Sequence, residues 1–239
     1  MTRTILVTGG GTGIGRAVAE RFAAEGADVI VTGRRPGPVT ATAEAIGGTA
    51  LVFDATDPGQ WESALDRLPD GIDVLVNNAG GNTDFDAAEP ADLAGVAKAW
   101  QVNLAANLFS AVLATTAVAD RLRSGGTVVQ LGSIAADQGA GAYGAAKAAL
   151  ASWNVDLAGQ LGPRDITCNV VSPGYVGDTE FFRDRLTDTR REQLISRTAT
   201  GRPGTPADVA GVVHYLASPD ARHVTGQVIN VNGGAWPTR

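Results

Sequence analysis

The stretch that decides the fold is residues 8–15, Thr8-Gly9-Gly10-Gly11-Thr12-Gly13-Ile14-Gly15. A short apolar run precedes it, and apolar residues at helical spacing follow it, so it joins a predicted strand to a predicted helix. Glycines at such a turn let the backbone approach a ligand closely, and the free N–H groups at the start of the helix favour an anion. A glycine-rich turn could be only a turn, but in this position it predicts a site for the pyrophosphate of a dinucleotide. The residues predicted to form that site are Gly9, Thr12, Gly13, Ile14 and Gly15.

Seven short apolar runs, separated by helix-compatible stretches, continue this pattern along the chain. The runs alternate little between apolar and polar residues, which indicates burial on both faces, as in a parallel sheet covered by helices. Alternation of strand and helix predicts a Rossmann-type, doubly wound, seven-stranded parallel sheet with helices on both faces. No linker or internal repeat interrupts it, so we expect a single domain over residues 1–239. The runs cover residues 4–8, 28–31, 50–53, 72–76, 127–131, 166–171 and 227–231.

The composition narrows the possible partners. The 239-residue chain has a formal net charge of −6, with 44% hydrophobic and 18% charged residues. This is a globular composition, and the acidic balance argues against a nucleic-acid partner, which needs a basic face. The single cysteine, Cys168, excludes an intrachain disulfide, and two histidines are too few for a histidine-based metal site. With no targeting signal and no apolar run of about 18–20 residues, we expect a cytoplasmic protein without a metal or a membrane partner.

The turn after the second predicted strand, Thr32-Gly33-Arg34-Arg35, distinguishes between two dinucleotides. An NAD site usually has a carboxylate here for the ribose 2′-hydroxyl, and none is present. A guanidinium can instead bind a 2′-phosphate through charge-assisted hydrogen bonds. We therefore expect NADP(H) as the cofactor, with Arg34 as the first contact to the phosphate and Arg35 as the second. The alternative is a solvated basic turn.

Tyr143 and Lys147 form the candidate proton-transfer pair. They are four residues apart in a helical stretch, which puts both side chains on one helix face. A phenol has a pKa of about 10, and a nearby ammonium favours the phenolate and lowers that pKa. Tyr143 is thus predicted to donate a proton to a ketone or to accept one from an alcohol. Such a pair on a helix usually has no chemical role, but its place after the fifth strand of a dinucleotide fold favours catalysis.

Three of these motifs together resemble the short-chain dehydrogenase/reductase family. They are Thr-Gly-x-x-x-Gly-Ile-Gly in the glycine loop, Asn77-Asn78-Ala79-Gly80 after the fourth strand, and Tyr-x-x-x-Lys, and the resemblance extends over nearly the whole chain. It implies that Ser133 polarises the substrate carbonyl and that Asn103 holds a water joining Lys147 to solvent. As bare sequence, Ser133 could equally cap a loop. Ser133 precedes Tyr143 by ten residues, fewer than the family often has, which leaves the shape of the pocket open.

The resemblance also assigns cofactor contacts beyond the glycine loop. Asp54, with Ala55, follows the third strand and would accept a hydrogen bond from the adenine amino group. The alternative is that Asp54 caps the next helix, where Asp57 competes. Asn78, Ala79 and Gly80 would lie beside the cofactor. On the nicotinamide side, the resemblance implies contacts from Tyr143, Lys147, Pro173, Gly174, Val176 and Thr179.

The C-terminal segments 201–210 and 226–234 are similar to those of 3-oxoacyl-acyl-carrier-protein reductases. That likeness implies a small carbonyl or alcohol substrate, an acyl carrier protein as a candidate partner, and a homotetramer or homodimer. Arg123 and Arg164 lie near positions where such enzymes contact the carrier protein, although both are equally well read as ordinary surface arginines. Candidate pocket residues are Thr83, Phe85, Gln138, Tyr175 and Phe181.

Three functional hypotheses remain from the sequence. The first is an NADPH-dependent reductase that converts a ketone, such as a 3-oxoacyl thioester, to a secondary alcohol. The second is an NADP-linked alcohol or sugar dehydrogenase that works in the oxidative direction. The third is a regulatory protein that binds the cofactor without turnover, against which the set of Asn103, Ser133, Tyr143 and Lys147 argues.

Overall fold

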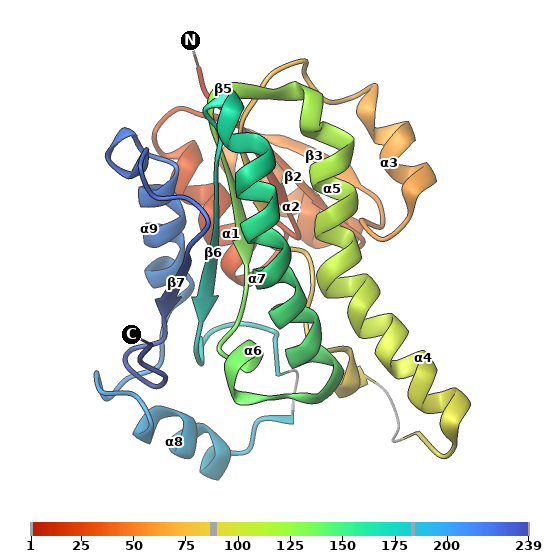
Figure 1. The fold of residues 1–239 in the computed structure, drawn as a ribbon, viewed down its shortest axis with the longest axis vertical. Coiled ribbons are helices and arrows are strands. Elements are labelled where there is room, and N and C mark those ends of the chain that lie inside the picture. The colour runs from red at the N-terminus through yellow and green to blue at the C-terminus, as the bar shows by residue number, and fades with distance from the viewer. Residues whose placement is uncertain (1, 87–89, 183–184, 239) are drawn as a thin grey trace.

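The computed structural model describes residues 2–86, 90–182 and 185–238. A single parallel sheet of seven strands lies at its centre, in the order β3-β2-β1-β4-β5-β6-β7 (Figure 1). All seven predicted runs are strands, so the predicted fold class is confirmed. The strands are β1 (Thr4–Thr8), β2 (Asp28–Gly33), β3 (Thr49–Val52), β4 (Ile72–Asn77), β5 (Leu122–Leu131), β6 (Thr167–Pro173) and β7 (Val228–Val231).

Helices cover both faces of the sheet. One apolar cluster joins α1, α2 and α9 to one face, and a second joins α3, α5 and α7 to the other. Between these helices lie η1 (Thr83–Asp86) and a short π-helical turn, η2 (Ala105–Phe109), which connects α4 to α5. The helices are α1 (Gly13–Ala23), α2 (Pro36–Ile46), α3 (Pro58–Leu65), α4 (Leu93–Leu104), α5 (Ser110–Val118), α6 (Ala135–Gln138), α7 (Gly141–Leu161), α8 (Asp188–Ser196) and α9 (Pro206–Leu216).

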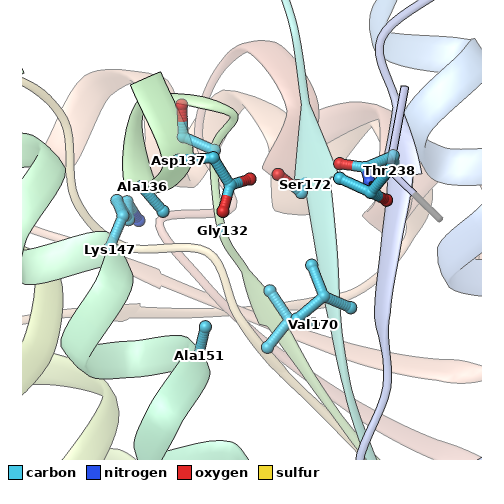
Figure 2. Close-up of a pocket in the computed structure, with 11 residues that line it drawn as sticks. Gly132, Ala136, Asp137, Lys147, Ala151, Val170, Ser172 and Thr238 are labelled. Carbon is cyan, nitrogen blue, oxygen red and sulfur yellow. The ribbon is translucent and has the colours of Figure 1, made fainter. Parts of the chain in front are cut away.

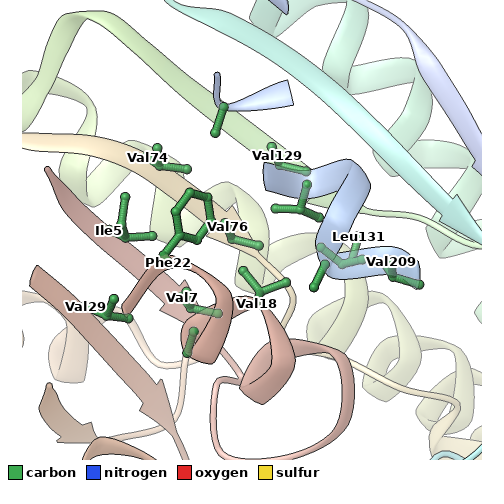
Figure 3. Packing of buried hydrophobic residues seen from close by; sticks show 14 of the residues in the cluster. Ile5, Val7, Val18, Phe22, Val29, Val74, Val76, Val129, Leu131 and Val209 are labelled. Carbon is green, nitrogen blue, oxygen red and sulfur yellow. The ribbon is translucent and has the colours of Figure 1, made fainter. Parts of the chain in front are cut away.

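Strand β1 shows why its sequence lacks alternation. Ile5 and Val7 belong to the cluster under α1, whereas Leu6 belongs to the cluster on the opposite face, and all three are fully buried. Phe22 of α1 packs beside Ile5 in the first cluster (Figure 3). Because successive strand residues point to opposite faces, a strand covered on both sides needs apolar residues at every position.

The strand order indicates at which edge of the sheet a ligand would bind. The chain moves outward from β1 through β2 to β3, and then returns to β4 on the other side of β1. Ligands of such sheets bind beyond the carboxyl ends of the strands at this point of reversal. Thr8 pairs with Asn77 there, so the last residues of β1 and β4 are neighbours. The glycine loop and the segment after β4 therefore begin side by side.

Residues Leu93–Arg121 form one helical stretch that contains α4, η2 and α5. By length and composition this stretch could cross a membrane, with a mean hydropathy of 1.6, and 39% of its most apolar window is buried inside the fold. Core helices of soluble proteins meet the same criterion, and this one packs against α7. Apolar side chains remain exposed along it, among them Val96, Trp100 and Phe109.

Candidate active site

The glycine loop is held by the segment that follows β4. The Thr8 hydroxyl accepts hydrogen bonds from the backbone N–H groups of Asn78 (3.1 Å) and Ala79 (3.0 Å). In return, Asn78 Nδ2 donates to the carbonyls of Thr8 (3.1 Å) and Gly9 (2.9 Å). Gly9 has a φ of 64° and lies against Ala79, a backbone conformation that favours glycine. Two motifs that are distant in the sequence thus form one rigid unit.

The start of α1 offers a place for an anion. Thr12 is the N-cap of this helix and makes no side-chain capping hydrogen bond, so the first N–H groups of the helix stay available for a phosphate. A cavity of about 570 Å³ opens beside it, lined by Gly13 on one side and Thr179 on the other. The segment after β6, where the nicotinamide contacts were predicted, therefore reaches the glycine loop.

The predicted phosphate-binding arginines lie at the carboxyl end of β2. Arg34 Nη1 is 4.0 Å from Asp54 Oδ2, and Arg35 Nη2 is 2.6 Å from Glu180 Oε2. All four side chains are partly or largely exposed, and exposed ion pairs contribute at most about 1 kcal/mol. The long contact leaves Arg34 the less constrained of the two arginines, in agreement with the prediction that it would be the first contact to a 2′-phosphate.

Asp54 does not cap the helix that follows it. Asp57 is the N-cap of α3 and accepts from the N–H groups of Gly59 and Gln60. Asp54 Oδ1 instead accepts from Thr56, both from its N–H (2.9 Å) and from its hydroxyl (2.8 Å). The carboxylate is thereby held at the end of β3, beside Arg34. This arrangement agrees with the predicted cofactor role of Asp54 and disfavours the capping alternative.

Tyr143, Lys147 and Ser133 converge at the carboxyl end of β5. Tyr143 and Lys147 lie in the first two turns of α7, and both side chains are buried. Lys147 Nζ donates to the Leu131 carbonyl (2.7 Å) and is 5.9 Å from the centre of the Tyr143 ring. The Ser133 hydroxyl accepts from the Ala135 N–H (3.1 Å) and is hydrogen-bonded to Tyr143. The sheet edge thus brings together the three residues of the predicted constellation.

The electrostatics of this pair differ from the prediction. Burial raises the pKa of Tyr143 to about 12, and the hydrogen bond from Ser133 opposes this shift only in part. Burial also lowers the pKa of Lys147 to about 8. The prediction that the lysine lowers the tyrosine pKa is therefore wrong for this arrangement. The reason is that Lys147 donates to Leu131 rather than to the phenol, so desolvation of Tyr143 has the larger effect.

A cavity of about 270 Å³ lies beside Ser133 and Lys147. Figure 2 shows Lys147 and Ala151 of α7 on one side of it, and Ser172 and Thr238 on the other. Among the described residues, its lining includes Ser133 and Lys147 but not Tyr143. The ring of Tyr143 instead contacts Phe181. Phe181 packs against Phe85 and Phe182, and Phe182 in turn contacts Phe85 and Tyr175.

The other residues predicted to line the substrate pocket or to contact the nicotinamide do not all lie in the same place. Thr83 lies beside Asn103, to which its N–H donates (3.3 Å), whereas Gln138 is exposed at the end of α6. The Thr179 hydroxyl donates to the Val176 carbonyl (3.3 Å). Pro173 ends β6, and the Gly174 N–H donates to Val231 (3.2 Å), which anchors the start of this segment on β7.

The two arginines considered for carrier-protein contact lie at the opposite end of the sheet from Tyr143. Arg123 Nη1 is 2.7 Å from Asp73 Oδ2, at the amino ends of β5 and β4. Arg164 donates to the backbone carbonyls of Ala119 (2.8 Å) and Leu122 (2.7 Å). Arg222 likewise joins the start of β5 to Asp165, just before β6. These three arginines connect the amino end of β5 to β4 and to the segment that precedes β6.

Asn103 is fully buried, but its side chain is occupied by the segment after β4. Its Nδ2 donates to Asp84 Oδ1 (2.7 Å), and its Oδ1 accepts from the Thr83 N–H (3.3 Å). Asn107, one turn later, donates to the Asn103 carbonyl (3.0 Å) and exchanges two hydrogen bonds of 2.9 Å with the backbone of Gly81. Sequence reasoning set Asn107 aside in favour of Asn103. The signal that could have identified it is a second asparagine inside a helix, where this residue type is unfavourable.

Replacing Asn107 by leucine should lower both stability and activity. The side chain is 1% exposed, and its loss leaves one buried and two partly buried backbone groups without their partner, at a cost of about 2–4 kcal/mol. For a chain of this size the midpoint of thermal unfolding should fall by about 5–15 °C. Gln101→Leu, on an exposed residue of α4, is the control and should change the midpoint little. Equal melting of the two variants would contradict the structural role of Asn107.

Comparison with known proteins adds a family assignment to this geometry. The chain matches the family model described as Enoyl-(Acyl carrier protein) reductase over residues 9–235. It is 35% identical to the 3-oxoacyl-[acyl-carrier-protein] reductase FabG of Escherichia coli (strain K12), over 97% of this chain and 96% of that protein. A mutant of a Serratia marcescens short-chain dehydrogenase/reductase is 34% identical, with a TM-score of 0.84 over 98% of this chain and 97% of the other. A blue fluorescent protein from a metagenomic library, solved in complex with NADPH, is 31% identical, with a TM-score of 0.85 over 98% of each chain.

Fold and site together define an oxidoreductase of the dinucleotide-binding α/β class. The chain belongs to the short-chain dehydrogenase/reductase family, and within it is similar to 3-oxoacyl-acyl-carrier-protein reductases. The family predicted from the glycine loop, the Asn-Asn-Ala-Gly segment and the Tyr-x-x-x-Lys pair is confirmed.

Proposed function

We propose that the protein is an NADP(H)-dependent carbonyl reductase that converts a ketone to a secondary alcohol, with Tyr143 as the general acid. The observation that carries this proposal is the convergence of Tyr143, Ser133 and Lys147 at the sheet edge that also holds the glycine loop. A non-catalytic, cofactor-binding protein would have no need for a buried phenol hydrogen-bonded to a serine beside a buried lysine.

The residues around the glycine loop fit NADP(H). The uncapped start of α1 suits the pyrophosphate, Arg34 suits the 2′-phosphate, and Asp54 suits the adenine. Thr179, across the cavity from Gly13, suits the nicotinamide carboxamide. When bound there, the reduced cofactor supplies a hydride to the carbonyl carbon.

The side chains that meet at the end of β5 would bind and protonate the carbonyl oxygen of the substrate. The Ser133 hydroxyl donates a hydrogen bond to it, which stabilises the negative charge that develops as the C=O double bond is reduced. The Tyr143 hydroxyl then transfers its proton to this oxygen, completing the alcohol. With its pKa raised by burial to about 12, the phenol is protonated at neutral pH, as a proton donor to a ketone must be. Lys147 would return a proton to Tyr143 through ordered water, whereas the Asn103 side chain is held by Thr83 and Asp84.

An oxidation screen with purified protein tests the proposal. NADPH absorbance is followed with a panel of aryl ketones, β-keto esters, 3-oxoacyl thioesters, quinones, steroids and sugars, and NADH is tested in parallel. We expect turnover of at least one ketone with NADPH. NADPH binding without oxidation by any member of the panel would support the regulatory alternative, and faster oxidation of alcohols than reduction of ketones at neutral pH would support the dehydrogenase.

The cofactor preference should depend on Arg34. Arg34→Asp replaces the guanidinium by a carboxylate, which repels a 2′-phosphate and can accept from a 2′-hydroxyl. The ratio of kcat/KM for NADPH to that for NADH should therefore fall by at least tenfold. Arg67→Asp is the control, because Arg67 is exposed and lies beyond α3. An unchanged ratio in Arg34→Asp would place the phosphate contact elsewhere.

The pH dependence of reduction should report Lys147. A lysine pKa of about 8 means that the ammonium is present below this pH and is lost as pH rises through it. If the charge assists proton return to Tyr143, kcat/KM for ketone reduction should be level from pH 6 to 7 and decline above about pH 8. A profile that stays level to pH 9.5 would show that the charge of Lys147 has no part in the step.

The proposal also covers the oligomeric state and the cellular location of the protein. The name of the Escherichia coli relative puts 3-oxoacyl thioesters and an acyl carrier protein among the candidate substrates and partners. Exposed apolar side chains on α4, η2 and β7, including Trp100, Phe109 and Val228, support pairing of identical subunits into a cytoplasmic homotetramer. Light scattering of the purified protein would give its mass directly.

A further inference from the structure

Four aromatic side chains form a connected group that reaches the ring of Tyr143 through Phe181, and we call them the aromatic wall. They are Phe85 in η1, and Tyr175, Phe181 and Phe182 in the segment after β6. The centre of the Phe181 ring is 5.6 Å from that of Tyr143 and 5.8 Å from that of Phe85. Phe182 lies 5.0 Å from Phe181, 5.7 Å from Phe85 and 5.8 Å from Tyr175. These separations are typical of favourable aromatic pairs.

The aromatic wall is distinct from the two apolar clusters that cover the sheet. Each of its four rings is partly exposed, and none belongs to either cluster. The chain has six phenylalanines and three tyrosines, of which three phenylalanines and two tyrosines meet here. Such a concentration of partly exposed rings is not needed to hold the sheet together. It is characteristic of a ligand-binding surface, where apolar groups surround a few polar ones.

The position of Phe181 ties the aromatic wall to the substrate. A ketone that reaches Ser133 and Tyr143 carries two substituents on its carbonyl carbon. Because Phe181 contacts the phenol ring itself, one of these substituents must lie against Phe181 or its neighbours. An aromatic substituent in this place can form a further edge-to-face ring pair with these side chains. A saturated substituent of the same size would be stabilised only by burial of its apolar surface.

We propose that the aromatic wall selects ketones with an aryl group next to the carbonyl, and that Phe181 is the main contact to that ring. This inference rests on the proposed function and narrows its substrate class. It disfavours carrier-bound 3-oxoacyl thioesters, because the amide groups of the carrier arm would lose hydration against three phenylalanine rings, and Tyr175 is the one member of the aromatic wall with a hydrogen-bonding group.

The test compares phenyl methyl ketone with cyclohexyl methyl ketone, which have the same number of heavy atoms. The ratio of their kcat/KM values with NADPH is measured in the wild type, Phe181→Leu and Phe182→Leu. Each replacement should lower the phenyl-to-cyclohexyl ratio by about twofold to tenfold, the factor expected for one aromatic pair. Comparison of ratios between variants cancels the different intrinsic reactivity of the two ketones. Tyr175→Leu and Tyr215→Leu form a matched pair, because Tyr215 is exposed on α9 away from the aromatic wall, and only Tyr175→Leu should change the ratio.

A second measurement needs no variant. Benzamide should inhibit the wild type with a lower inhibition constant than cyclohexanecarboxamide. Equal constants, an unchanged ratio in both phenylalanine variants, or a higher kcat/KM for an acetoacetyl thioester than for phenyl methyl ketone would each overturn the inference while leaving ketone reduction intact. If neither ketone nor thioester is reduced, the proposed function fails and this inference fails with it.

Discussion

Tyr143→Phe should reduce NADPH-dependent ketone turnover by about 10²–10⁴-fold, the usual contribution of a general acid. The variant removes one hydroxyl and keeps the ring that packs against Phe181, so the fold and the affinity for NADPH should change little. The measurement is kcat/KM for the best ketone of the screen, together with a fluorescence titration of NADPH. The loss should appear in kcat, since the proton is transferred only as the alcohol forms.

Tyr215→Phe is the control for this variant. Tyr215 lies on α9 and is 47% exposed, so loss of its hydroxyl should leave turnover unchanged. If Tyr143→Phe keeps more than a tenth of wild-type activity, Tyr143 is not the proton donor. If it loses NADPH affinity in parallel with turnover, the phenol has a binding role instead.

Gly15→Ala should impair both cofactor binding and stability. A Cβ at this position would lie 2.3 Å from the Gly9 carbonyl oxygen and 2.4 Å from Asn78 Nδ2. Neither atom can move freely, because Asn78 Nδ2 is bonded to the Gly9 carbonyl. The loop must therefore open, which should cost about 1–3 kcal/mol of stability and weaken NADPH binding by at least tenfold.

Gly159→Ala is the matched control on α7. A Cβ there meets nothing within 4 Å, and alanine is favoured over glycine inside a helix by about 1 kcal/mol. This variant should melt at the same or a higher temperature and bind NADPH normally. Wild-type NADPH affinity in Gly15→Ala would show that the glycine loop tolerates a side chain and that the cofactor does not depend on its close packing.

The sequence contained most of the fold because each strand is buried on both faces. Unbroken apolar runs mark such strands, and all seven were found at their positions. The main difference is β5, which begins at Leu122 rather than at residue 127. The register between β4 and β5 is irregular over those first residues, and polar and glycine residues there hide the strand from a search for apolar runs.

The candidate site was less completely predictable, for physical reasons. Spacing placed Tyr143 and Lys147 on one helix face but could not show that Lys147 donates to Leu131 or that burial raises the pKa of Tyr143. The sequence named Phe85 and Phe181 as pocket candidates but not Phe182, whose contacts with Phe85 and Tyr175 depend on how the distant segments pack together. Motifs identify residues that act on the ligand, whereas contacts between distant loops appear only in the folded chain.

The arginines at the amino edge of the sheet suggest where this protein could be engineered for heat resistance. At the end of the sheet farthest from Tyr143, Arg123 joins β5 to β4, and Arg164 and Arg222 join the start of β5 to the segment before β6. Changes at this edge would act on resistance to unfolding while the distance from the reacting atoms protects the turnover rate. The amino ends of the strands could therefore be stabilised without changing the site at their carboxyl ends.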